Sequence, residues 1–162
     1  MKLEGEQLVL DTNVLLHWFR GKEPGAKLRA EYALGTRSPR PILPVVVKAE
    51  IKSLALQFEW GDDKRHALDE LLRELPIADI SSEQVVTDYA RLDFESRKLG
   101  RRMGKHDLWI AAVAAVQGAV IHAHDEGEVL GSGAGEGIFP GEFAEVGQLV
   151  AGAFFRAGGD MG

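Results

Sequence analysis

Residues 7–16 read Gln-Leu-Val-Leu-Asp-Thr-Asn-Val-Leu-Leu, and this stretch decides how the chain folds. Its apolar run 8–10 predicts a short buried strand, and residues 13–20 have the character of a helix. Asp11 therefore stands where a strand ends and a helix begins. In an open α/β sheet this is the edge at which ligands bind.

The rest of the chain repeats this alternation of strand and helix. Short apolar runs predict further strands at 41–43, 76–80 and 119–122. Helical spacing predicts helices over 24–34, 44–60, 62–75, a segment from about Ser82 to Gly100, and 107–117. Strands that alternate with helices predict an α/β domain, with a central, mostly parallel β-sheet flanked by helices on both faces.

The C-terminal part of the chain differs in composition from the rest. Eleven of the 19 glycines lie beyond Asp125, and residues 125–162 hold seven acids and one base. A chain of 162 residues has the length of one domain. We therefore expect a folded domain over residues 1–130 and a Gly-rich, acidic extension over 131–162, packed on that domain or trailing from it, with a helix over 146–156.

Composition and charge narrow the classes of function. The chain has no cysteine, which excludes disulfides, thiolate nucleophiles and Cys-based metal sites, and fits a reducing compartment. No apolar stretch has the ~20 residues needed to span a bilayer, so we expect a soluble cytoplasmic protein with no membrane partner. The net charge of −6 by itself argues against a nucleic-acid-binding protein.

One basic segment changes that interpretation. Residues 97–105 hold five cations and no acid, and these cations are Arg97, Lys98, Arg101, Arg102 and Lys105. Cations suit the C-terminal end of a helix, which is the structural alternative. Their closeness to Asp107 favours contact with the phosphate backbone of RNA.

Four acids stand at the edges of elements that we expect to be buried: Asp11 after the first strand, Glu50 beside an apolar helix stripe, Asp107 in the first turn of the most apolar helix, and Asp125 after the last strand. Each has a structural alternative. Asp11 or Asn13 can cap a helix, Glu50 can pair with a lysine or reach solvent, and Asp107 suits the positive end of a helix dipole.

Grouped carboxylates of this kind favour phosphodiester hydrolysis. Carboxylate oxygens are preferred ligands of Mg²⁺ and Mn²⁺, and these ions also bind substrate phosphate. A metal held in this way activates a bound water and stabilises the charge on the leaving oxygen. Because converging carboxylates repel one another, such a site also favours a bound cation.

Three segments carry a resemblance to a known family. Residues 8–16, residues 47–51 with Glu50, and residues 104–112, which read Gly-Lys-His-Asp-Leu-Trp-Ile-Ala-Ala, resemble the successive motifs of PIN-domain ribonucleases. Within that family the chain is most similar to the VapC toxins of bacterial type II toxin–antitoxin pairs. The resemblance covers about residues 8–129, and residues 104–112 are its most specific part.

The resemblance implies a fold, an activity and partners. It implies a PIN-like domain in which Asp11, Glu50, Asp107 and Asp125 form an acidic Mg²⁺ or Mn²⁺ site, supported by Asn13 and Thr12. Glu128 matches another position that is often acidic, so the fourth acid is Asp125 or Glu128. It further implies a metal-dependent endoribonuclease acting on RNA, a homodimer and a cognate antitoxin protein.

Two other functions remain open at this point. The chain can be a non-catalytic PIN-like binding module that keeps an acidic pocket. It can also be a phosphatase or phosphoacceptor that uses Asp11. Against this last alternative, Asn13 stands where an Asp-x-Asp phosphatase signature has its second Asp.

Overall fold

The computed structural model describes residues 4–22, 25–100 and 102–122, and within these ranges strands alternate with helices as the sequence predicts. Arg101, Asp125, Glu128 and the segment 131–162, with its predicted helix over 146–156, lie outside the described residues. The elements in chain order are β1 (Leu8–Leu10), α1 (Thr12–Arg20), α2 (Gly25–Tyr32), β2 (Leu43–Pro44), α3 (Val45–Gln57), α4 (Asp62–Arg73), β3 (Ile77–Ala78), α5 (Glu83–Lys98), α6 (Lys105–Gln117) and β4 (Val120–His122).

The described strands form a small layer in which every pairing is parallel. β1 pairs with β4, with Leu8 opposite Val120, and β2 pairs with β3, with Leu43 opposite Ile77. Ile42, just before β2, joins the two pairs. Its N–H donates to the Leu8 carbonyl at 2.7 Å, and its carbonyl accepts from the Leu10 N–H at 3.0 Å. The strand order is therefore β4-β1-β2-β3, which confirms the predicted parallel arrangement.

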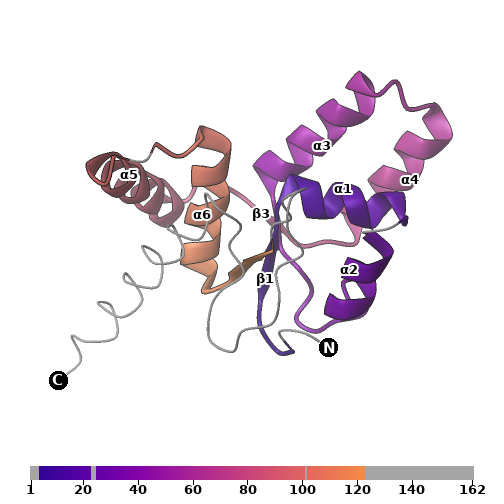
Figure 1. Cartoon of the computed structure of the whole chain (residues 1–162), viewed down its shortest axis with the longest axis horizontal. Coiled ribbons are helices and arrows are strands. Elements are labelled where there is room, and N and C mark those ends of the chain that lie inside the picture. Colours follow the sequence, from indigo (N-terminus) through magenta and orange to yellow (C-terminus); the bar gives the residue numbers. More distant parts are fainter. Residues whose placement is uncertain (1–3, 23–24, 101, 123–162) are drawn as a thin grey trace.

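Helices lie on both sides of this layer, as predicted. Figure 1 shows α5 and α6 on one side of the strands and α1 to α4 on the other. α6 packs against β1 and β4 and is covered in turn by α5, whereas α1 packs against α2 and α3. None of the helices in the described part of the chain combines the length and apolarity needed to cross a membrane.

The core forms where β1 meets α6. All three residues of β1 are fully buried, and so are Leu108 and residues 110–114 of α6. A helix that is apolar nearly all round is expected to be buried on most sides, and α6 fits that expectation. Because α6 is fixed along most of its length, its first turn has a defined position at the edge of the strands.

The first residue of α2 lies against the backbone of α1. A Cβ atom built on Gly25 would stand 1.8 Å from the carbonyl oxygen of His17, which is far inside van der Waals contact. Glycine therefore permits the close approach of the two helices. The close packing of α2 on α1 also bears on Asp11, because Asp11 directly precedes α1.

We expect Gly25→Ala to lower the free energy of unfolding by about 1–3 kcal/mol, because α1 and α2 must separate to admit the methyl group. Chemical denaturation followed by circular dichroism measures the change. Gly35→Ala is the matched control, since a Cβ there meets only the Arg29 side chain at 3.9 Å. Equal stability of the two variants would show that the approach of α2 to α1 is not constrained at Gly25.

Candidate active site

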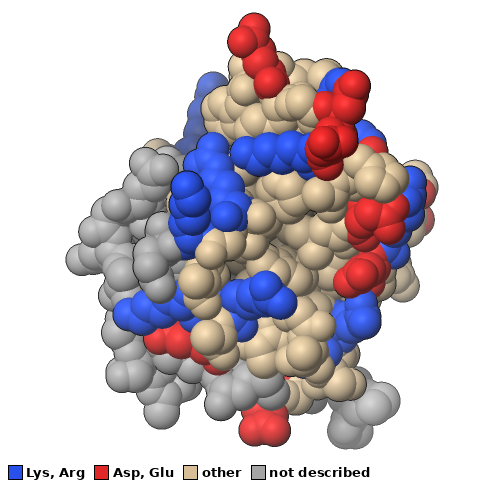
Figure 2. Space-filling view, turned by 90° about the vertical axis from the view of Figure 1, so that its right-hand side faces the viewer, with Lys and Arg blue, Asp and Glu red and all other residues tan. Residues whose placement is uncertain are grey.

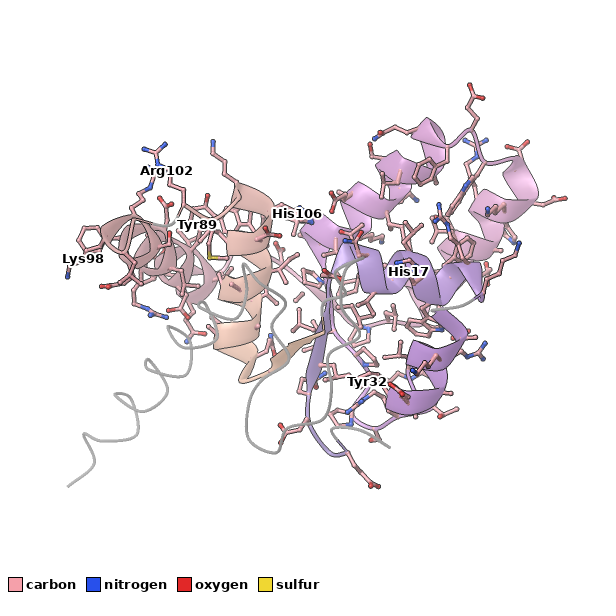
Figure 3. The ribbon with its side chains drawn as sticks, in the orientation of Figure 1. His17, Tyr32, Tyr89, Lys98, Arg102 and His106 are labelled. Carbon is pink, nitrogen blue, oxygen red and sulfur yellow. The ribbon has the colours of Figure 1, made fainter. Side chains whose placement is uncertain are left out.

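Three of the predicted acids come from three different helices. Asp11 ends β1 and is the N-cap of α1, Glu50 lies in the second turn of α3, and Asp107 lies in the first turn of α6. α3 starts directly after β2, and α6 packs across β1 and β4, so these helix starts lie at one edge of the strand layer. Figure 3 shows His106, the residue before Asp107, at the place where α6 faces α3.

The carboxylate of Asp11 caps α1, which is one of the two roles that the sequence suggests. Its Oδ1 accepts from the Val14 N–H at 2.9 Å, which caps α1, and only 9% of the residue is exposed. The pKa of Asp11 is raised to about 7, mainly by burial and in addition by the nearby charges of Asp107 and Glu50, against the lowering effect of the Val14 and Asn13 N–H groups. The cap of α1 and the predicted metal ligand are therefore the same side chain.

Glu50 has two partners that the sequence analysis did not connect with it. Its Oε2 accepts from the Thr12 hydroxyl, and Nε2 of His106 lies 2.6 Å from the same oxygen, within ion-pair distance. Thr12 Oγ1 and His106 Nε2 are themselves 3.3 Å apart. The partner of Glu50 is thus a histidine, where the structural alternative from the sequence was a lysine.

His106 is the site residue that sequence reasoning missed. It stands between Lys105 and Asp107, at the start of the most apolar helix in the chain. A polar, ionisable residue directly before a candidate metal ligand was the available signal. The pattern could not show which carboxylate it meets, because Glu50 belongs to a separate helix.

The two remaining described residues of the predicted site are Asp107 and Asn13. Asp107 is partly buried, and its Oδ2 lies 3.4 Å from the position that a Cβ on Gly104 would take. The absence of a side chain at Gly104 therefore leaves room for this carboxylate. Asn13 is exposed, and it acts on Asp11 through its backbone N–H.

The chemistry of the donor set fits a divalent cation, although the acids are not closed around one. In the described ranges, no three His, Asp or Glu side chains are grouped so as to hold a metal ion. The charges of Asp107 and Glu50 nevertheless both act on Asp11 and add to the effect of burial in raising its pKa. A divalent cation would offset the repulsion between the carboxylates. Mg²⁺ is bound in proteins mainly by oxygen ligands, which these carboxylates supply.

Comparison with known proteins identifies the family. A sequence profile of the PIN domain matches residues 8–127. The chain belongs to the PIN domain family. No curated protein sequence matches it.

Solved structures with the same fold include VapC-type PIN domains of toxin–antitoxin complexes. VapBC2 from Rickettsia felis, bound to a DNA fragment from its promoter, is 22% identical, with a TM-score of 0.59 over 70% of this chain and 84% of that one. VapBC-1 from nontypeable Haemophilus influenzae is 25% identical, with a TM-score of 0.59 over 73% and 86%. Mycobacterium tuberculosis VapC20, a sarcin-ricin loop cleaving toxin, is 14% identical, with a TM-score of 0.57 over 75% and 92%.

The basic segment of this PIN domain is only partly available to a ligand. Arg97 Nε donates to Asp93 at 2.9 Å, and Lys98 lies over the ring of Phe94. Arg102 and Lys105 are exposed, and Arg101 lies outside the described residues. In Figure 3, Lys98 lies at the outer end of α5, away from His106.

The face formed by α1, α2 and α4 also carries lysines and arginines (Figure 2). Three cations on α3 and α4 are paired with acids of α4: Arg65 with Asp62, Arg73 with Glu70, and Lys52 of α3 with Asp69. Their charge is therefore largely offset at short range. This face supplies matched controls for the basic segment.

The raised pKa of Asp11 predicts a specific dependence of stability on pH. Between about pH 4 and pH 7 the folded protein keeps a proton that the unfolded chain releases, so the free energy of unfolding falls as pH rises through this window. Asp11→Asn keeps a capping side chain and removes the charge. In chelator, we expect the variant to gain on the order of 2–4 kcal/mol over the wild type between pH 4 and pH 8.

Denaturant unfolding at each pH measures this difference. Asp79→Asn is the control of opposite sign, because backbone and side-chain hydrogen bonds from Ser81 lower the pKa of Asp79 in the folded protein. That variant should lose stability relative to the wild type as pH rises through about 4. A pH-independent difference for Asp11→Asn would mean that Asp11 is already ionised near pH 4.

Proposed function

We propose that this PIN domain is an endoribonuclease that hydrolyses RNA phosphodiester bonds with Mg²⁺ or Mn²⁺. The observation that carries the proposal is that Glu50 on α3 and Asp107 on α6 both lie close enough to the N-cap of α1 for their charges to act on Asp11 and to help raise its pKa. A group of carboxylates at the edge of a parallel strand layer is a costly arrangement without a cation. The similarity between this fold and that of VapC toxins supports the same class of reaction, which is RNA hydrolysis.

In this proposal the three acids that lie in the described part of the chain have positions that suit a metal ligand. Asp11 is oriented by its bond to the Val14 N–H, and Glu50 by the Thr12 hydroxyl. Asp107 reaches the site from the fixed first turn of α6, and Asp125 or Glu128 supplies the fourth acid. Asn13 supports Asp11. The bound cation would activate water and stabilise the charge on the leaving oxygen.

We expect Asp107→Asn to reduce RNA cleavage by about a hundredfold or more, because it removes a negative ligand while the core of α6 stays intact. The assay follows cleavage of a mixed pool of structured RNAs in Mg²⁺, in Mn²⁺ and in chelator. Asp69→Asn is the control, since Asp69 lies on α4 and pairs with Lys52.

Two results would contradict this proposal. Retained cleavage by Asp107→Asn would remove Asp107 from the mechanism. The absence of both cation binding and RNA cleavage in the wild type would favour the binding-module alternative.

We further propose that Arg102 and Lys105 contact the RNA backbone, with Arg101, Arg97 and Lys98 in the same basic segment. In a non-cleaving Asp107→Asn background, we expect the double change Arg102→Gln and Lys105→Gln to weaken RNA binding. The slope of log affinity against log salt should fall by roughly 0.7 for each lost phosphate contact on a single strand.

Fluorescence anisotropy across a salt series measures both effects on RNA binding. Arg73→Gln is the control, because Arg73 is already paired with Glu70 on α4. Arg97→Gln should have a smaller effect than the double variant, since Asp93 holds the Arg97 guanidinium. An unchanged slope in the double variant would show that Arg102 and Lys105 do not meet phosphates.

We also propose that the protein is the toxin of a toxin–antitoxin pair, acts in the cytoplasm and forms a homodimer. The support is the set of similar structures, in which VapC-type chains are found in VapBC complexes. In such a pair the antitoxin would cover the acidic site and block RNA. We propose that the nuclease domain comprises residues 1–130 and that residues 131–162 are an extension of it.

A further inference from the structure

One oxygen atom of Glu50 is contacted by two side chains at the site. The Thr12 hydroxyl donates to Oε2, and Nε2 of His106 lies 2.6 Å from the same atom, so the contacts come from the starts of α1 and α6. Thr12 Oγ1 and His106 Nε2 are 3.3 Å apart. The three side chains therefore form a closed cluster that links α1, α3 and α6.

The cluster stands directly beside the other two acids. Thr12 follows Asp11 in the chain, and His106 precedes Asp107. Glu50 acts on Asp11 electrostatically, yet in the part of the chain that the structure describes the acids are not grouped to hold an ion. Oε2 of Glu50 is in contact with Thr12 and His106.

We propose that His106 is a positioning residue that holds Glu50 through Oε2 and competes with a divalent cation for that atom. The inference rests on the proposed function, because it takes Glu50 as a metal ligand. It assigns to His106 a role in setting how tightly the cation binds.

Burial indicates which of the two side chains leaves when a cation arrives. Thr12 is 7% exposed, so its hydroxyl has no access to a full shell of water and stays on Glu50. The side chains of His106 and Glu50 are 35% and 43% exposed. The imidazole can therefore exchange its bond to Glu50 for bonds to water.

The same exposure sets the size of the effect. Ion pairs that are open to solvent contribute little, so removing this competitor should tighten cation binding by about two- to fivefold. The experiment is isothermal titration of the full, metal-free chain with Mn²⁺. We expect His106→Ala and His106→Asn to lower the Kd for Mn²⁺ by that factor, and the rise in Tm caused by a fixed Mn²⁺ concentration to be larger than in the wild type.

Two controls separate competition at Glu50 from general effects. His66→Ala removes a comparable contact on α4, where His66 Nε2 lies 3.7 Å from Glu70 Oε1. It should leave the Kd for Mn²⁺ unchanged. In a Glu50→Gln background, His106→Ala should no longer tighten Mn²⁺ binding, because the carboxylate for which His106 and the cation compete is absent.

His106→Asn keeps a polar side chain in the first turn of α6. Circular dichroism tests whether both His106 variants fold.

An unchanged or raised Kd for Mn²⁺ in both folded His106 variants would overturn the inference, and so would the absence of Mn²⁺ binding by the wild type and the variants alike. RNA cleavage, measured separately, tests the proposed function. Tighter Mn²⁺ binding by His106→Ala without RNA cleavage by the wild type would leave the inference standing and remove the nuclease. Metal-dependent cleavage with equal Kd values would keep the nuclease and remove the role of His106.

Discussion

The hydrogen bond from the Val14 N–H to Oδ1 of Asp11 is the contact on which the site depends. It starts α1 immediately after β1, and it fixes the direction of a carboxylate that is almost fully removed from solvent. A buried carboxylate is costly unless it is neutral or paired with a cation. The burial that orients Asp11 is thus also the reason why it keeps its proton to about pH 7 in the metal-free protein.

Much of the fold could be predicted because local pattern determines it. The apolar run of β1, the Ser82 cap of α5 and the uniformly apolar α6 each have a signal within a few residues. α6 begins at Lys105, two residues before the predicted start, because its first two residues are polar and fall outside the apolar pattern. For Asp11, the sequence offers two interpretations, a helix cap and a member of the acidic site. These interpretations do not exclude each other.

The contacts between elements could not be predicted in this way. Nothing near Glu50 in the sequence indicates that His106 and Thr12 meet it, since the packing of α1, α3 and α6 brings them together. The basic segment shows the same difficulty. A count of cations over residues 97–105 treats Arg97 as equal to Lys105, whereas Asp93 on the same helix already binds Arg97.

The strand layer has one narrow connection, and this has a mechanical consequence. Only the two backbone hydrogen bonds of Ile42 link the β1–β4 pair to the β2–β3 pair within the described strands. Asp11 directly follows β1 of the β1–β4 pair, whereas Glu50 lies on α3, which starts directly after β2 of the β2–β3 pair. An ion bound by both acids would add a crosslink across the seam of the sheet, beside the contact that Thr12 already makes with Glu50, so the two strand pairs would be held together more firmly when the ion is present.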